Sequence, residues 1–99
     1  MSEIRPDISL QDVVRVGPDV VFRILDGEAV LLNLKSGVYF GLNEMGTNIW
    51  NNLAENGSLE AVYSRILEQY AVEPEVVKSD LLRITGELLD KGLVSVSPR

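Results

Sequence analysis

The hydrophobic residues between positions 20 and 42 fall into three short runs, each separated from the next by turn residues. The runs cover residues 20–25, 29–34 and 38–42, and they are rich in the β-branched and aromatic side chains typical of strands. Asp26-Gly27 is a strong two-residue hairpin signal, and Gly37 suits the left-handed position of a second turn. The pattern predicts a three-stranded antiparallel meander whose first and third strands are both edges.

Beyond residue 43 the apolar residues repeat at helical spacing. Each predicted helix has suitable residues at its ends, because Asn and Ser cap helix N-termini, Pro fits a first turn and Gly ends a helix. Strands first and helices after predict an α+β domain, with three helices packed on one face of the sheet. The helices and their flanking residues are 44–55 after Asn43, 58–70 from Ser58, and 74–91 from Pro74 with Gly92 beyond its end.

The two ends of the chain are less regular. Residues 1–19 are predicted to form an N-terminal arm, and residues 20–99 form the domain. The apolar stretch at 13–16 is either a short strand or part of an ordered tail laid over the domain. Residues 94–96 either add a short strand or pack as coil. The first ten residues lack the apolar segment of a secretory signal.

The composition limits the chemistry that the chain can perform. It contains no Cys and no His, which excludes disulfides and the usual zinc, haem and histidine-based catalytic sites. We therefore expect no metal and no cofactor, and an enzyme is the weakest functional hypothesis. The formal net charge of −6 argues against a nucleic-acid partner, whose phosphates require a basic surface. No apolar run approaches the length of a membrane span, so we expect a cytoplasmic protein with no membrane partner.

The third predicted strand is the first candidate binding surface. Residues 38–42 carry neither charge nor proline, the features that usually protect an open edge, so an extended peptide could add there as a further strand. Gly41 would let another backbone approach closely. The pattern alone favours the alternative, in which Gly41 only marks a bulge before the first helix.

The third predicted helix is the second candidate binding surface. It has two apolar stripes, whereas one stripe is enough to pack a helix against a core. The flanking stripe either lines a groove beside the sheet edge or is buried as well, and periodicity alone favours burial. Trp50 lies on the apolar stripe of the first helix and is expected in the core. The two stripes of the third helix are Val77, Leu81, Ile84 and Leu88, and Leu82, Thr85 and Leu89.

Several of these segments resemble the PqqD family, also described as the recognition element of ribosomally synthesised and post-translationally modified peptides. The resemblance extends over residues 20–96 and depends on the order and spacing of its blocks. They are Glu28-Ala29-Val30-Leu31-Leu32-Asn33-Leu34-Lys35-Ser36-Gly37-Val38-Tyr39-Phe40-Gly41-Leu42-Asn43, then Gly46-Thr47-Asn48-Ile49-Trp50, then Asp80-Leu81-Leu82, Leu88 and Lys91-Gly92-Leu93-Val94.

The resemblance implies a winged-helix-like fold and a peptide-binding function without catalysis. A leader peptide would add beside the third strand, with alternate side chains entering a cleft against the third helix, and either stripe of that helix could form the wall. A Gly41→Pro or Leu42→Pro change is expected to abolish binding while the fold survives. The implied site residues are Val38, Tyr39, Phe40, Gly41 and Leu42 of the strand and Leu81, Leu82, Ile84, Thr85 and Leu88 of the helix.

The resemblance also implies protein partners. Family members present the leader of a precursor peptide to a modifying enzyme, either a radical-SAM protein or the protease and cyclase of lasso-peptide pathways. The Tyr-x-Gly-Leu-Asn block resembles the discrete lasso-type proteins more closely. Two alternatives stay open. One is a winged-helix DNA-binding regulator, which the acidic third helix disfavours, and the other is a structural domain that forms a homodimer through its open edges.

Overall fold

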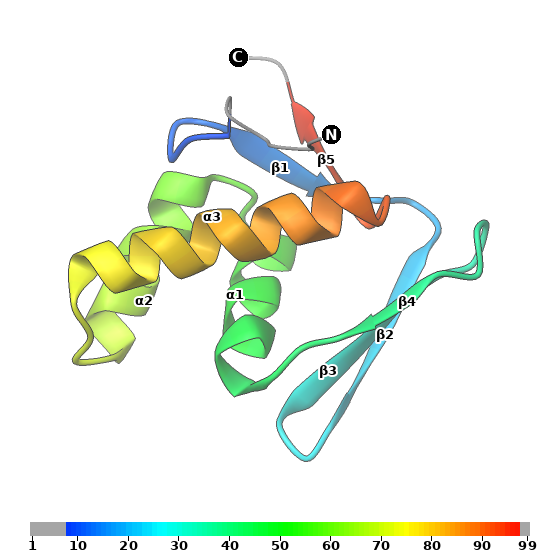
Figure 1. The fold of residues 1–99 in the computed structure, drawn as a ribbon, viewed down its shortest axis with the longest axis horizontal. Coiled ribbons are helices and arrows are strands. Elements are labelled where there is room, and N and C mark those ends of the chain that lie inside the picture. The colour runs from blue at the N-terminus through cyan, green and yellow to red at the C-terminus, as the bar shows by residue number, and fades with distance from the viewer. Residues whose placement is uncertain (1–7, 98–99) are drawn as a thin grey trace.

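The computed structural model describes residues 8–97. Strands and helices follow one another much as the hydrophobic pattern predicts, and the fold class is confirmed as α+β with a three-stranded sheet and three helices (Figure 1). The elements are β1 (Val13–Val16), β2 (Val20–Leu25), β3 (Glu28–Asn33), β4 (Tyr39–Gly41), α1 (Glu44–Glu55), α2 (Leu59–Gln69), α3 (Pro74–Asp90) and β5 (Val94–Ser97).

Strands β2, β3 and β4 form an antiparallel meander in sequence order, so β2 and β4 are its edges. The turn between β2 and β3 has positive φ at both central residues, 55° at Asp26 and 80° at Gly27, which gives it the twist of a tight hairpin. Gly37 has φ 79° in the turn before β4. These turn residues determine the register that pairs Leu31 with both Phe22 and Phe40.

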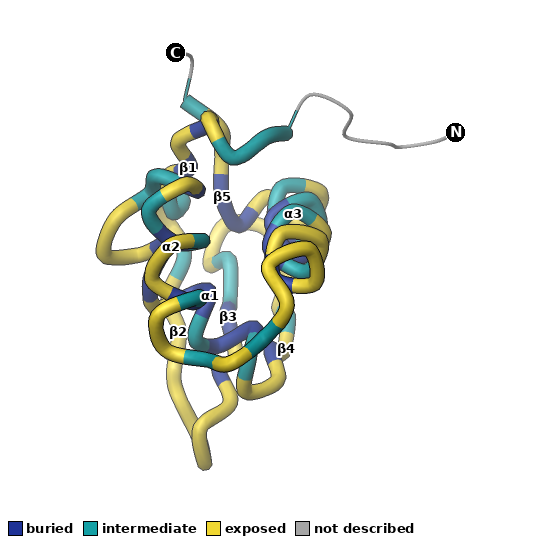
Figure 2. The backbone as a smooth tube through the Cα atoms, turned by 90° about the vertical axis from the view of Figure 1, so that its left-hand side faces the viewer, coloured by how far each residue is buried: buried dark blue, intermediate teal, exposed yellow. Residues whose placement is uncertain are grey.

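The two faces of this sheet differ in burial. Ala29 and Leu31 of β3 are buried toward α1, whereas Val30 between them is exposed on the outer face. The helices lie on the inner side only (Figures 1 and 2). The outer face therefore stays open, although it carries apolar side chains.

A second, two-stranded sheet joins the two ends of the chain: β1 pairs with β5, and Val14 lies opposite Val96. The Val14 N–H donates to the Gly57 carbonyl at 2.8 Å, so β1 is also bonded to the loop between α1 and α2. Val14 is 2% exposed and belongs to the core. Residues 13–16 and 94–97 are therefore strands, whereas residues 1–7 of the expected arm lie outside the described residues.

The helix ends use the expected capping residues. The Asn43 and Ser58 side chains accept hydrogen bonds from the N–H groups of Gly46 and Ala61, at 2.9 and 3.3 Å. Gly92 ends α3 at φ 69°. The N–H of Leu93 then donates to Leu88 O at 2.9 Å, which completes a Schellman motif and brings Leu93 into the core.

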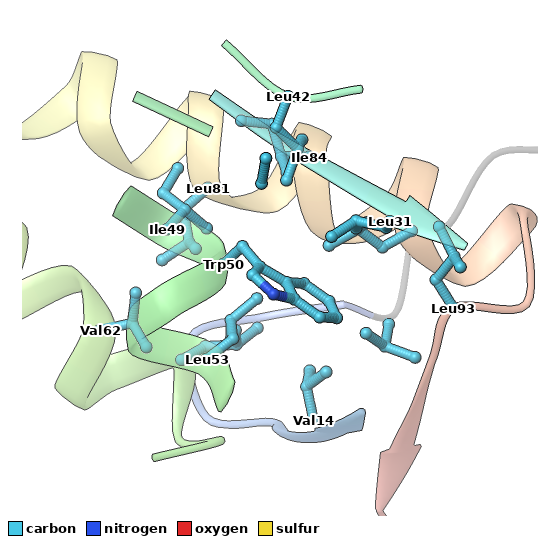
Figure 3. Close-up of a cluster of buried hydrophobic side chains, with 14 of the residues drawn as sticks. Val14, Leu31, Leu42, Ile49, Trp50, Leu53, Val62, Leu81, Ile84 and Leu93 are labelled. Carbon is cyan, nitrogen blue, oxygen red and sulfur yellow. The ribbon is translucent and has the colours of Figure 1, made fainter. Parts of the chain in front are cut away.

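The core surrounds Trp50 of α1, whose side chain is fully buried, as expected. Figure 3 shows side chains from the strands and helices around its indole. The ring of Phe22 meets the indole edge-on at 5.6 Å between centroids. None of the helices in residues 8–97 is long and apolar enough to cross a membrane.

Candidate functional site

The open edge of β4 presents main-chain groups at alternate residues. The Leu42 N–H donates to Ala29 O at 2.8 Å, and the Asn33 N–H donates to Val38 O at 2.9 Å. In an antiparallel ladder the bonding direction alternates along the strand, so the main-chain groups of Tyr39 and Gly41 point away from β3. The fold therefore leaves the N–H and C=O groups of these two residues available at the edge.

The five strand residues expected at the site divide between the two faces of the sheet. Phe40 and Leu42 lie on the helix side, where Phe40 is half-buried and Leu42 is buried, and Val38 precedes β4 on the same side. Tyr39 is 71% exposed on the outer face. A Cβ added at Gly41 would meet nothing within 4 Å, so the outer face of the sheet is open at this position.

The five helix residues expected at the site are mostly interior. Leu81, Ile84, Thr85 and Leu88 are all buried. Figure 3 shows Leu42 directed toward Ile84, which places the segment after β4 against this part of α3. These residues form the floor between strand and helix rather than its exposed wall.

Leu82 lies on the opposite flank of α3. It is half-buried and lines a hollow with Lys78 and residues 8–11. In Figure 2 this N-terminal segment crosses on the side of α3 away from β4. The flanking stripe of Leu82 and Leu89 therefore faces the N-terminal segment and not the open edge.

The flank of α3 beside β4 is charged, and the sequence pattern did not indicate it. The ammonium nitrogen of Lys91 lies 5.3 Å from the ring centroid of Phe40, which fixes the side of the helix that faces β4. Helical spacing places Glu87 and Ile84 on the same side, one and two turns before Lys91. Arg83 pairs with Glu87 at 3.5 Å and with Asp80 at 3.6 Å. Ile84, Glu87 and Lys91 share this flank, but their spacing alone does not show that it faces β4.

This arrangement is suited to hold an extended peptide. The edge of β4 offers main-chain donors and acceptors, the inner residues offer an apolar floor, and α3 adds a charged rim. A peptide strand here would direct alternate side chains toward Phe40 and the adjacent flank of α3. We use the name β4–α3 groove for the surface between Phe40 and Leu42 on one side and Ile84, Glu87 and Lys91 on the other. Within residues 8–97, no three His, Cys, Asp or Glu side chains lie close enough together to hold a metal ion.

Comparisons with known proteins identify the family. The family model described as coenzyme PQQ synthesis protein D (PqqD) matches residues 28–94. The solved structure of TbiB1 in complex with the TbiA(beta) leader peptide is 33% identical, with TM-score 0.78, and the match covers 86% of this chain and 99% of that one. A lasso peptide synthetase B1 complexed with the leader peptide is 26% identical, with TM-score 0.73, over 83% and 96% of the two chains. No curated protein sequence matches the chain. The family match extends from the start of β3 to the start of β5, and the chain belongs to the PqqD family.

Proposed function

We propose that this protein binds the leader segment of a ribosomally made precursor peptide at the β4–α3 groove and presents that precursor to a modifying enzyme. The observation that carries the proposal is the open edge of β4, where Tyr39 and Gly41 turn their main-chain groups outward above an apolar floor. The two similar solved structures, each a complex with a leader peptide, support it.

The physical role of such a domain is to raise the local concentration of the precursor at the enzyme. Holding the leader converts a second encounter into an intramolecular one, without chemistry by this chain. An extended leader loses conformational freedom when it binds, so we expect micromolar affinity, roughly −8 kcal/mol. Both partners would meet the protein in the cytoplasm, where the precursor is made.

The outer face of the sheet supports the enzyme-binding part of the proposal. Val21, Leu32 and Tyr39 form one apolar row across the three strands, and Val21 and Tyr39 are exposed. A leader strand added to β4 would extend this face with its own side chains. We propose that the modifying enzyme docks here and contacts protein and leader together. The lasso synthetase neighbour favours a protease and cyclase pair over a radical-SAM protein.

The alternative functions receive no support from these features. The net charge of −6 opposes binding to DNA phosphates. Both similar structures are peptide complexes. A homodimer through an open edge is addressed by the experiments on β2 below.

The experiment is a binding titration with a fluorescently labelled leader peptide from the precursor encoded beside this protein. Gly41→Pro removes an outward N–H and should weaken binding at least tenfold, while Gly41→Ala should change it less than threefold, because only open space surrounds its Cβ. Circular dichroism and one-dimensional NMR verify that both variants are folded. Equal affinity of a folded Gly41→Pro variant would refute strand addition at β4.

The structure corrects one of the two substitutions expected to be diagnostic. The Leu42 N–H donates to Ala29 within the sheet, so Leu42→Pro breaks the bond between β3 and β4. Loss of binding in that variant would report damage to the fold. Gly41→Pro is the informative change, because its N–H faces the open edge.

A further inference from the structure

The second edge of the three-stranded sheet is also open. The Leu34 N–H donates to Asp19 O at 2.8 Å, so the even-numbered residues of β3 bond toward β2. Given the register, Arg23 bonds to Val30, while Phe22 and Ile24 turn their main-chain groups outward. Within residues 8–97 these outward groups have no hydrogen-bond partner. Figure 2 shows β2 exposed along nearly all its length.

Two apolar side chains of β2 lie at this edge. Phe22 is 45% exposed and Ile24 is 43% exposed, although both lie on the helix side of the sheet. Ile24 lines a hollow together with Asn48 and Asn51 of α1 and with Tyr70. A second hollow shares Asn48 and Asn51 with the first and reaches Gln69 of α2. We call the two adjoining hollows together the β2–α1 groove.

A hydrogen-bonded network holds the floor of this groove in place. The Asn48 side chain donates to the Tyr70 hydroxyl at 2.8 Å and accepts from the Asn52 amide at 2.8 Å. Arg65 donates to Asn52 Oδ1 at 3.1 Å and to Glu55 at 2.8 Å, which neutralises its charge. The network therefore offers a rigid, nearly neutral surface between α1 and α2.

Two side-chain amides in the groove do not belong to this hydrogen-bonded network. Asn51 and Gln69 are exposed, and neither side chain has a hydrogen-bond partner among the described residues. A side-chain amide presents a donor and an acceptor side by side, which matches the N–H and C=O groups of a peptide main chain. An extended chain here would pass between Ile24 of β2 and Asn51, and would reach Gln69 in the second hollow.

We propose that the β2–α1 groove is a second extended-peptide site, and that its occupant is the part of the precursor adjoining the segment held by β4. This inference rests on the proposed function. A strand added beside β4 and a chain beside β2 would lie about four strand spacings, roughly 19 Å, apart, a distance that at least six extended residues cross. Glu44 and Thr47, which follow closely after β4, line the near end of the groove. The near-neutral floor suits a segment of uncharged polar residues.

The groove has the length that such a segment needs. Its α1 wall extends from Glu44 to Glu55, about 18 Å of helix, which accommodates five or six extended residues. The precursor would then be held at two places, and its total affinity would exceed that of the β4-bound segment alone.

The test compares two synthetic peptides from the precursor encoded beside this protein. One is the full precursor, and the other is truncated to the segment that NMR maps to β4. Asn51→Ala should weaken binding of the full precursor about five- to tenfold, which corresponds to the loss of one or two net hydrogen bonds. Binding of the truncated peptide should not change. Alanine is the better helix former, so a merely structural role predicts no loss of binding. Ile24→Pro, which removes an outward N–H, should also weaken binding of the full precursor and leave binding of the truncated peptide unchanged.

Each outcome separates this inference from the proposed function. If both variants bind the two peptides as the unmodified protein does, while Gly41→Pro weakens both peptides, the second site is wrong and the β4 site stands. If Gly41→Pro weakens neither peptide, the proposed function fails. If sedimentation shows a dimer that Ile24→Pro dissociates, the occupant of β2 is a second copy of this chain, and the inference is overturned.

Discussion

The ammonium nitrogen of Lys91 lies 5.3 Å from the centroid of the Phe40 ring, so one contact joins the end of α3 to the middle of β4. This contact shows which flank of α3 lies beside β4. Because helical spacing places Glu87 and Ile84 on the same side as Lys91, it also identifies the wall that a bound peptide would meet. The consequences for stability and for binding can be measured separately.

A double-mutant cycle between Lys91 and Phe40 tests this contact. Lys91→Met and Phe40→Leu each remove one partner, and a cation above an aromatic ring at a partly exposed site contributes about 0.5–1 kcal/mol. We expect a coupling energy of that size from urea unfolding of the four proteins. Strictly additive losses would mean that the lysine does not rest on the ring in solution.

The loop at Gly57 is a second sensitive point. A Cβ at this position would overlap the carbonyl oxygen of Val14, and the Val14 N–H is bonded to the same loop. Gly57→Ala should therefore destabilise the protein by about 1–3 kcal/mol, because β1 must shift. Gly41→Ala is the matched control, since its Cβ enters open space. Equal unfolding midpoints for the two variants would contradict the packing of β1 against this loop.

Thr47 links α1 to both neighbouring strands. Its hydroxyl accepts from the Ala29 N–H at 2.7 Å and donates to Leu42 O at 3.3 Å. Thr47→Val has nearly the same shape and leaves both buried groups unpaired, which should lower the free energy of unfolding by about 1–3 kcal/mol. Thr47→Ser keeps the hydroxyl and should lose less. If Thr47→Val unfolds at the same urea concentration as the unmodified protein, the two hydrogen bonds of the hydroxyl do not contribute to stability.

The outer face of the sheet provides a test of enzyme docking. Val21 is 45% exposed there, so Val21→Glu should leave folding and leader affinity nearly unchanged. Conversion of the precursor by the enzymes encoded beside this protein should fall at least fivefold, because a charge is introduced into an apolar interface. Ser64→Glu adds the same charge on the exposed side of α2 and should leave conversion unaffected. Equal conversion by both variants would place the docking surface elsewhere.

Local sequence signals were sufficient for most of the fold. Asp26-Gly27, Asn43, Ser58 and Gly92 act through their own backbone neighbours, so their types alone predict the turns and caps that the structure contains. The pairing of β1 with β5 was not predicted. These four-residue strands lie at opposite ends of the chain, and the loop that bonds β1 is distant in sequence from both.

The candidate site was predictable only in part. The absence of charge and proline in residues 38–42 indicated an open edge, but which main-chain groups face outward depends on the register with β3. Apolar periodicity directed attention to Leu81 and Leu88, which are core residues. The flank that faces β4 carries Glu87 and Lys91, and charged residues give no periodic signal of their direction until the helix is packed on the sheet.

The most direct measurement for the central claim is an amide-resolved NMR titration with the leader peptide of the neighbouring precursor. We expect the largest shift changes at Tyr39 and Gly41, whose N–H groups point outward, with smaller changes at Ile84, Glu87 and Lys91 on α3. The amides of Phe40 and Leu42, which bond within the sheet, should move less. Shift changes absent from β4, or confined to the outer flank at Leu82 and Leu89, would contradict leader binding by strand addition at this edge.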